Sequence, residues 1–317
     1  MRLNSIVVSR TDSIGDVTLT LPVCGAIKRC SPRTKVMFLC SAYTLPIVRA
    51  CRWVDEAHIW PGPIPSADAI VHVFPRREIA RAALHIPLRV GTYSRWYHWT
   101  TCNRPVRLHR KRSRLHEIEL NLKLLRPLFP DCDLPEASEL YGLEVRAPLP
   151  PDFESELRAY AAGRPVVLLH PKSKGSAREW PASHWRELHR LLCDGGYAPV
   201  VTGVEAEKQA FVRQAGNDFF FAAGRLDLDA LMRLMVESEG LIAASTGPLH
   251  ISAALGRKAL GIYPPMRPMH PGRWGPRGPR ARALALDRDC RRCRKSVLCD
   301  CVRAISPQAV FEAWRTL

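Results

Sequence analysis

The chain has 317 residues, 46% of them hydrophobic, which is enough to fill two hydrophobic cores of ordinary size. Its 47 Lys and Arg residues outnumber its 30 Asp and Glu residues, giving a formal net charge of +17. This excess favours an acidic partner: nucleic acid, an anionic membrane face or a phosphorylated glycan. No apolar run has the length of a signal-peptide core or a membrane span, so we expect a cytoplasmic protein.

The eleven cysteines do not follow the pattern of a secreted disulfide scaffold. Four of them, Cys24, Cys30, Cys40 and Cys51, fall in or next to predicted strands and helices, where cysteine commonly acts as a small buried hydrophobic residue. We therefore expect most of the cysteines to be reduced thiols.

The first half of the chain alternates short β-branched runs with helical stretches. Strands are predicted at 6–8, 35–39, 57–60 and 69–74, and helices at 17–29, 45–52 and 115–128. Such alternation is typical of a parallel sheet with helices on both faces. Prolines accumulate from 130 to 152, which predicts a linker at 142–152 and two domains, 1–147 and 148–317.

The second half repeats the alternation, which predicts a second parallel sheet. Strands are expected at 166–170, 198–202, 241–244 and 259–263, and helices at 153–162, 182–194, 205–215, 228–236, 250–255 and 307–317. The last helix is amphipathic, so one of its faces should be buried.

Two turns each follow a predicted strand and open a helix: Ile14-Gly-Asp-Val17 and Ser245-Thr-Gly-Pro-Leu-His250. Unpaired N–H groups and the helix dipole make such turns suited to anions. The carboxylate of Asp16 in the first turn, and the side chains of Thr246 and His250 in the second, predict a general base facing a bound diphosphate.

These turns belong to a set of motifs that resembles the inverting heptosyltransferases of glycosyltransferase family 9. The set is Ile14-Gly-Asp-Val17 followed by Leu21-Pro22, Arg178-Glu-Trp-Pro181, Gly203-Val-Glu205, Ser245-Thr-Gly-Pro-Leu-His250 and Arg273-Trp-Gly-Pro276. The resemblance implies an α/β fold of GT-B type, with two facing Rossmann-like domains built on parallel sheets. It also implies acceptor binding by 1–147, nucleotide-sugar binding by 148–317, and packing of the last helix, 307–317, on the first domain.

The resemblance makes Asp16 the catalytic base. Inverting glycosyl transfer needs one carboxylate near the acceptor hydroxyl, although an Asp in a first helical turn can also act only as a cap. Arg10 and Ser13 are predicted to bind the acceptor, because ligands of open parallel sheets bind beyond the carboxyl ends of strands. For Arg10 the alternative is an ordinary surface arginine.

Eleven basic residues and a single acid, Glu78, lie between Arg76 and Arg114, with Tyr93, Trp96, Tyr97 and Trp99 interleaved. A solvated basic face is the usual explanation of such a run. The aromatic residues favour a binding surface instead. The residues assigned here to acceptor binding are Arg76, Arg77 and Arg95.

Donor and phosphate binding is predicted for residues of two loops and one helix start. They are Ser173, Lys174, Arg178, Glu205, Ser245, Thr246, Gly247, Leu249 and His250. A cationic loop suits a leaving diphosphate, and a carboxylate after a strand can accept both hydroxyls of a ribose, although a solvated acid is equally compatible. Many family members have Asp at the position of Ser245, so the donor sugar stays open.

Four thiols fall within twelve positions: Cys290, Cys293, Cys299 and Cys301. They can enclose a structural zinc or iron ion, since four thiolates suit tetrahedral coordination; unligated thiols are the alternative. Catalysis should need no cofactor, because Arg178 and helix N-termini can neutralise the leaving diphosphate.

The resemblance implies transfer of heptose from ADP-heptose to the inner core of lipopolysaccharide, or to a similar acidic glycan, by a protein peripheral to the inner membrane. One alternative changes the acceptor to protein hydroxyls, as in autotransporter glycosylation. Another is a basic nucleic-acid-binding protein with a zinc knuckle. That alternative leaves Asp16 and the second turn without a role, so we expect no nucleic acid partner.

Overall fold

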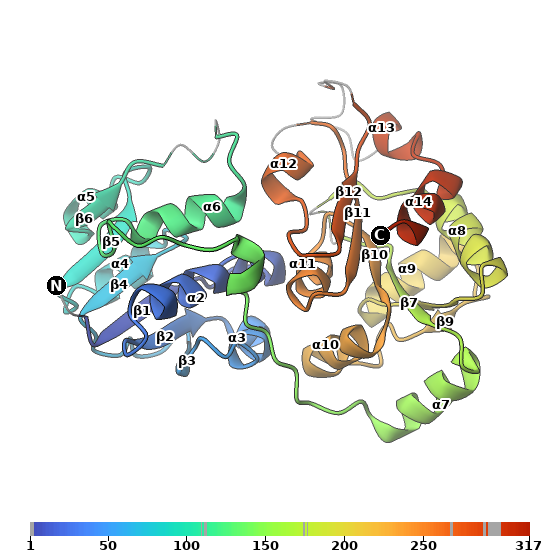
Figure 1. The fold of residues 1–317 in the computed structure, drawn as a ribbon, viewed down its shortest axis with the longest axis horizontal. Helices are drawn as coiled ribbons and strands as arrows, with labels where there is room; N and C mark the ends of the chain where they lie inside the picture. Colours follow the sequence, from blue (N-terminus) through green and yellow to red (C-terminus); the bar gives the residue numbers. More distant parts are fainter. Residues whose placement is uncertain are drawn as a thin grey trace. The chain divides into compact units, whose positions relative to one another are not determined.

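The computed structural model describes residues 3–108, 110, 113–173, 175, 177–266, 269–287, 290 and 299–317. The chain divides into two compact units, Met1–Glu144 and Val145–Leu317. Each unit is a parallel six-stranded sheet flanked by helices (Figure 1). Within these described ranges, no helix has the length and apolar character needed to span a bilayer.

The strands of the first unit lie in the order β3-β2-β1-β4-β5-β6. Their bounds are β1 Ser5–Ser9, β2 Lys35–Cys40, β3 Glu56–Ile59, β4 Ala69–His72, β5 Leu88–Thr92 and β6 Arg104–Val106. This is the order of a doubly wound dinucleotide-binding sheet, in which the direction of winding reverses between the first and fourth strands. The reversal between β1 and β4 fixes where a ligand binds.

The second unit repeats this order as β12-β11-β10-β7-β8-β9, with the reversal between β7 and β10. The bounds are β7 Val166–His170, β8 Ala198–Val201, β9 Phe220–Phe221, β10 Gly240–Ala244, β11 Lys258–Ile262 and β12 Ala281–Leu284. The predicted α/β class with parallel sheets is therefore confirmed for both halves.

The helix predicted at 17–29 is two helices in the structure. The first, α1 (Ile14–Thr18), ends before Thr20, and α2 (Leu21–Cys30) then begins with Pro22 at its start. Proline has no N–H to donate to the preceding turn but is well suited to the first positions of a helix. The break leaves α1 as a short separate turn directly after β1.

The remaining helices of the first unit are short. They are α3 (Leu45–Arg49), α4 (Arg77–Ala82), α5 (His98–Thr101) and α6 (Glu117–Leu122), with 3₁₀ turns at Ala42–Thr44, Lys123–Leu125 and Ala137–Leu140. The sequence did not predict α4, β5 or β6, because arginines interrupt their apolar pattern, nor α5, which has only four residues. The inner face of α4 nevertheless packs into a core on the sheet through Ile79 and Ala83.

The helices of the second unit follow the prediction more closely. They are α7 (Pro151–Ala161), α8 (Ala182–Asp194), α9 (Glu205–Ala215), α10 (Leu228–Glu237), α11 (Gly247–Ala254), α12 (Pro271–Trp274), α13 (Asp300–Arg303) and α14 (Pro307–Arg315). The predicted bounds of α8 and α9 are correct, because each helix lies between a strand and a turn that can both be recognised in the sequence.

The last helix packs within its own unit, and its expected packing on the first domain stays a prediction. In the structure the apolar face of α14 is built into the core of the second unit through Val310, Phe311 and Trp314, and the helix packs against α8. Val310 and Trp314 are fully buried there. Burial of this face accounts for the amphipathic pattern of the helix.

A disulfide joins Cys30, at the end of α2, to Cys132, with 5.6 Å between the two Cα atoms. Cys30 is therefore not the reduced thiol that we expected. Cys24, Cys40 and Cys51 are buried free thiols, in agreement with the expectation for them.

A buried histidine pair lies at the carboxyl ends of β4 and β5. His72 is fully buried, and its ring centroid lies 5.7 Å from that of His98. Among the described residues neither ring nitrogen of His72 has a hydrogen-bond partner. Burial, reinforced by the neighbouring His98 and Arg89, lowers the pKa of His72 to about 3. The His72 ring is therefore neutral at physiological pH.

We expect the free energy of unfolding to fall as the pH drops below 6.5, the ordinary pKa of histidine, towards 3. The reason is that the unfolded chain binds a proton that folded His72 excludes, at a cost of about 1.4 kcal/mol per pH unit. His72→Gln should make this acid slope shallower, as measured by urea unfolding across that range. His85→Gln, at an exposed histidine, is the control and should keep the slope. Equal slopes in wild type and His72→Gln would contradict the assignment.

Candidate active site

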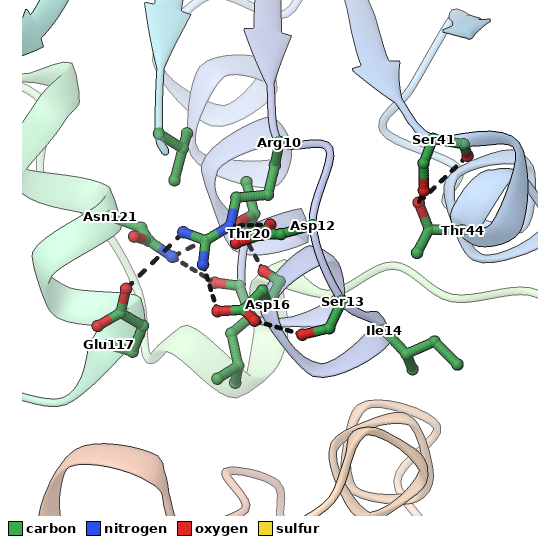
Figure 2. Close-up of polar contacts among 12 residues, drawn as sticks. Arg10, Asp12, Ser13, Ile14, Asp16, Thr20, Ser41, Thr44, Glu117 and Asn121 are labelled. Carbon is green, nitrogen blue, oxygen red and sulfur yellow. Dashed lines mark hydrogen bonds and ion pairs between the residues drawn. The ribbon is translucent and has the colours of Figure 1, made fainter. Parts of the chain in front are cut away.

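The first half of the candidate site lies where β1 ends, next to the reversal of strand order in the first sheet. β1 passes at Ser9 into Arg10, and α1 begins only four residues later (Figure 2). Ligands of open parallel sheets bind beyond the carboxyl ends of strands at such a reversal. The predicted residues Arg10, Ser13 and Asp16 all lie at this point of the fold.

Arg10 is the centre of this half-site, with a side chain that is only 3% exposed. Its Nε donates to Asp12 Oδ1 at 2.6 Å, and its Nη2 donates to Asp16 Oδ1. Its Nη1 lies 3.8 Å from Glu117 Oε1. Ser13 Oγ donates to the other carboxylate oxygen, Asp16 Oδ2. The structure thus holds Asp16 between the two predicted residues Arg10 and Ser13 (Figure 2).

The carboxylates decide the charge state of Arg10. Burial opposes its positive charge, but Asp12, Asp16 and Glu117 outweigh burial and raise the pKa of the guanidinium. Burial also raises the pKa of Asp12, and the negative charge of Asp16 raises it further, despite the opposing effect of Arg10. Asp12 is therefore a second carboxyl group suited to proton exchange in this cluster.

Glu117 fixes the far side of the cluster and was not predicted as a site residue. It is the first residue of α6, its side chain is 3% exposed, and it accepts a hydrogen bond from Arg110 Nη1. Arg110 also donates to Asn121 Oδ1 at 3.0 Å and to Val73 O at 3.1 Å. Asn121 Nδ2 donates to Leu19 O at 3.0 Å, which joins α6 to the end of α1.

Counting only the residues that the structure describes, the cluster carries one net negative charge when every member is ionised. Two guanidinium groups, those of Arg10 and Arg110, face the three carboxylates of Asp12, Asp16 and Glu117. One carboxylate can therefore take up a proton and leave the cluster neutral. This is the charge change that a general base undergoes when it deprotonates a hydroxyl group.

The chain neighbours of Arg10 have buried polar atoms, Ser9 Oγ and Thr11 Oγ1, with no hydrogen-bond partner among the described residues, and the same holds for Arg76 Nε. Leaving such an atom unpaired costs about 1–3 kcal/mol, so each is a candidate for a hydrogen bond to a ligand or to water. The guanidinium carbon of Arg76 lies 6.0 Å from the centroid of the Phe74 ring, and that of Arg10 lies 5.3 Å from the same centroid.

The other two predicted acceptor residues are placed differently. Arg77 is exposed, and its guanidinium carbon lies 5.2 Å from the ring centroid of Trp96. Arg95 is also exposed, in the turn between β5 and α5. Both residues therefore belong to an aromatic part of the surface, whereas Arg76 is associated with the same ring as Arg10.

The second half of the candidate site lies after β10, at the reversal of strand order in the second sheet. Thr246 is the residue that precedes α11, its side chain makes no capping hydrogen bond, and it is 6% exposed. Among the described residues its Oγ1 has no partner. Gly247 begins the helix, so the N–H groups of Gly247 and Leu249 are free of intrahelical bonds. The Leu249 side chain is fully buried, which leaves only its backbone for a ligand.

The flanking residues of this turn are held by the core. Ser245 is half-buried, and nearby Tyr263 is fully buried and donates its hydroxyl to Trp274 O at 2.6 Å. His250, in the first turn of α11, is 4% exposed. The turn therefore offers backbone N–H groups and the Thr246 hydroxyl on a rigid support.

The loop after β7 brings two further predicted residues to the same sheet edge. Ser173 and Arg178 are 5% and 9% exposed. Glu179, which was not predicted, organises the loop by accepting from Ser173 N at 3.1 Å and from Lys172 Nζ at 2.6 Å. Lys174 lies outside the described residues.

Glu205 is the first residue of α9, after the carboxyl end of β8. Its side chain is 54% exposed and accepts a hydrogen bond from Gln209 Nε2 at 3.2 Å. This position is open to a ligand, but the partners are also those of a solvated acid at a helix start. Its contact with a ribose stays a prediction.

The cysteines predicted to bind metal are only partly described. Cys299 and Cys301 are buried in the core of the second unit, and Cys290 packs against that core. Cys293 lies outside the described residues. In the part of the chain that the structure describes, no three His, Cys, Asp or Glu side chains form a group that can hold a metal ion. The four-thiolate site stays a prediction.

Comparison with known proteins identifies glycosyltransferases among the relatives of this chain. The family model glycosyltransferase family 9 (heptosyltransferase) matches residues 82–299. A putative glycosyltransferase of Haemophilus influenzae is 24% identical over 302 residues, which is 86% of each chain. Lipopolysaccharide heptosyltransferase 1 of Escherichia coli is 30% identical over 116 residues, which is 36% of each chain.

Solved structures of such enzymes share the fold. The ADP-heptose LPS heptosyltransferase II of E. coli has a TM-score of 0.75 and 19% identity, covering 98% of both chains. The dodecameric iron-containing heptosyltransferase TibC, in complex with ADP-D-β-D-heptose, has a TM-score of 0.63 and 16% identity, covering 99% of this chain and 76% of TibC. These similarities confirm the predicted GT-B fold.

We expect Arg10→Met to lower the free energy of unfolding by about 3–5 kcal/mol, because it leaves buried carboxylates without their cation. The loss should be smaller near pH 5 than near pH 8, since protonation of an orphaned carboxyl group relieves the repulsion. Urea unfolding at the two pH values measures both effects. Arg33→Met, at an exposed arginine, is the control and should change stability by less than about 0.5 kcal/mol. A similarly small change in Arg10→Met would contradict the central role of Arg10.

Proposed function

The chain belongs to glycosyltransferase family 9, and we propose that it transfers heptose from ADP-heptose to the inner core of lipopolysaccharide or to a similar acidic glycan. Membership makes it a glycosyltransferase of the heptosyltransferase family, which replaces the nucleic-acid-binding alternative. The single observation that carries the proposed reaction is the Arg10 cluster, which holds Asp16 at the ligand end of the first sheet.

The second unit is the proposed donor-binding half. TibC, which has the same fold, was solved with ADP-D-β-D-heptose, and this supports an ADP-linked heptose as the donor. The diphosphate would accept hydrogen bonds from the free N–H groups of α11 and from Thr246 Oγ1, and would pair with Arg178. Ser173, Lys174 and His250 are the further proposed contacts, and Glu205 would accept the ribose hydroxyls.

Asp16 is the proposed base. As the acceptor oxygen forms its bond to the anomeric carbon, its proton passes to the Asp16 carboxylate. The bond from that carbon to the diphosphate oxygen breaks on the opposite face of the sugar, so the configuration inverts and ADP leaves. Arg178 and the N-terminus of α11 stabilise the charge on the departing diphosphate.

The first unit is the proposed acceptor-binding half. The Arg76 Nε and the hydroxyls of Ser9 and Thr11, the chain neighbours of Arg10, have no partner among the described residues, and they suit an acceptor rich in hydroxyl and phosphate groups. An inner-core acceptor is linked to lipid, so this half of the enzyme would work at a membrane surface.

Asp16→Asn should lower kcat for heptose transfer by about 10²–10⁴-fold, because the amide cannot accept the proton of the acceptor hydroxyl. Binding of ADP should be unchanged, since the donor is assigned to the other unit. Turnover with ADP-heptose and a lipopolysaccharide acceptor, followed by mass spectrometry of the product, measures the effect.

Two further variants make this test specific for Asp16. Asp131→Asn changes an exposed acid in the same unit and should leave turnover as in wild type. Asp12→Asn tests the other carboxylate bound to Arg10 and should lower kcat less than Asp16→Asn does. A larger loss in Asp12→Asn, or transfer to protein rather than to glycan, would contradict the proposal.

Thr246→Val should weaken ADP binding about 5–10-fold without lowering the free energy of unfolding. Its hydroxyl has no partner in the described protein, so the valine loses only a hydrogen bond to the ligand. Thr34→Val is the matched control, because Thr34 Oγ1 donates to Leu3 O at 2.7 Å. It should reduce stability and leave ADP binding unchanged, as read by calorimetric titration and urea unfolding. Unchanged ADP affinity in Thr246→Val would count against this donor site.

A further inference from the structure

An exposed set of aromatic and arginine side chains lies around the turn between β5 and β6 of the first unit. Tyr93, Trp96 and Trp99 are 46, 61 and 68% exposed. Arg77 lies over the ring of Trp96, at 5.2 Å from its centroid, and Arg107 over the ring of Tyr93, at 5.8 Å. We call these five residues the aromatic–arginine surface.

The turn itself joins these side chains into one surface. Trp99 Nε1 donates to Tyr93 O at 3.2 Å, and the backbone N–H of Trp99 donates to Trp96 O at 3.0 Å. The two tryptophans are therefore three residues apart on one side of a tight turn. Their exposure is a property of an ordered segment, in which α5 and the strands on either side hold the backbone.

The charge around this surface is strongly positive. Arg77, Arg95, Arg104 and Arg107 are all exposed in this segment, and residues 76–114 include a single acid, Glu78. Large exposed aromatic groups are uncommon on a protein that has only water as its neighbour. Their combination with unbalanced arginines indicates a partner that is apolar in its interior and anionic at its surface.

We propose that the aromatic–arginine surface docks the protein on a bilayer containing anionic lipids. Tryptophan and tyrosine favour the headgroup level of a membrane, because each has an apolar ring and a polar tip. Arginine forms paired hydrogen bonds with phosphate, which every anionic phospholipid offers there. This inference deepens the proposed function, since an acceptor linked to lipid is met at such a surface.

The arrangement of the rings favours lipid over nucleic acid. Single-stranded nucleic acid binds by stacking its bases on the open faces of aromatic rings. Arg77 and Arg107 already lie over the rings of Trp96 and Tyr93, so each of these two rings has at most one face left for a base. Insertion between lipid headgroups needs no free ring face.

The proposed attachment is peripheral and electrostatic in part. Attraction between arginines and anionic lipids is screened over about one Debye length, which is about 10 Å at 0.1 M salt. Binding should therefore weaken as the salt concentration rises. It should also be much weaker on vesicles that carry no net charge.

The test is flotation of the full-length protein with vesicles of phosphatidylcholine alone, or of phosphatidylcholine mixed with phosphatidylglycerol. Wild type should float only with the mixed vesicles and less so at high salt. The double variant Trp96→Ala with Trp99→Ala should bind the mixed vesicles about tenfold more weakly or worse. Tyr43→Ala, at a tyrosine that is 58% exposed elsewhere in the first unit, is the matched control and should bind as wild type does.

The outcome can be separated from that of the proposed function, because flotation needs neither donor nor acceptor. Thermal unfolding shows whether the double variant is folded, and transfer to a deacylated, water-soluble acceptor should be the same in it as in wild type. Equal vesicle binding by wild type and the double variant would overturn the docking surface. So would stronger binding of wild type to a single-stranded oligonucleotide than to the vesicles. A protein that floats as expected but transfers no heptose would instead refute the proposed function.

Discussion

The buried guanidinium of Arg10 is the constraint around which the first unit's ligand end is built. A permanent charge removed from water is tolerated only when opposite charges and hydrogen bonds surround it. Asp12 comes from the turn after β1, Asp16 from α1 and Glu117 from α6, so one side chain fixes three separate segments. The same contacts set the orientation of Asp16. Structural support and the orientation of Asp16, the proposed base, are therefore supplied by a single ion-pair network.

The sequence predicted elements well where local signals are unambiguous. β7 and β10 are buried apolar runs, and α8 and α9 lie between clear turns, so their predicted and observed bounds nearly coincide. β5 was missed because Arg89 interrupts its apolar residues. In the structure Arg89 Nε donates a hydrogen bond to Thr101 O at 2.6 Å, which gives the last carbonyl group of α5 a partner. The polar residue within this strand has a tertiary role that no local pattern reveals.

The candidate site was predicted to the extent that it is local in sequence. Arg10, Ser13 and Asp16 lie within seven positions, between the end of β1 and the first turn of α1. Glu117 belongs to the same cluster but lies about a hundred residues away, where nothing in the sequence distinguishes it from other acids at helix starts. The disulfide between Cys30 and Cys132 was missed for the same reason, with a sequence separation of 102. Contacts of this kind depend on how the sheet brings distant segments together.

The repeated strand order, β3-β2-β1-β4-β5-β6 in one unit and its counterpart in the other, has a consequence for how such enzymes diversify. In each sheet the order of the strands determines the edge at which ligands bind. The strands themselves can therefore tolerate extensive substitution as long as they stay apolar. The segments that follow each strand are then free to change separately in the two halves. With the proposed assignment of the acceptor to one unit and the donor to the other, specificity for one substrate can evolve while recognition of the other is kept.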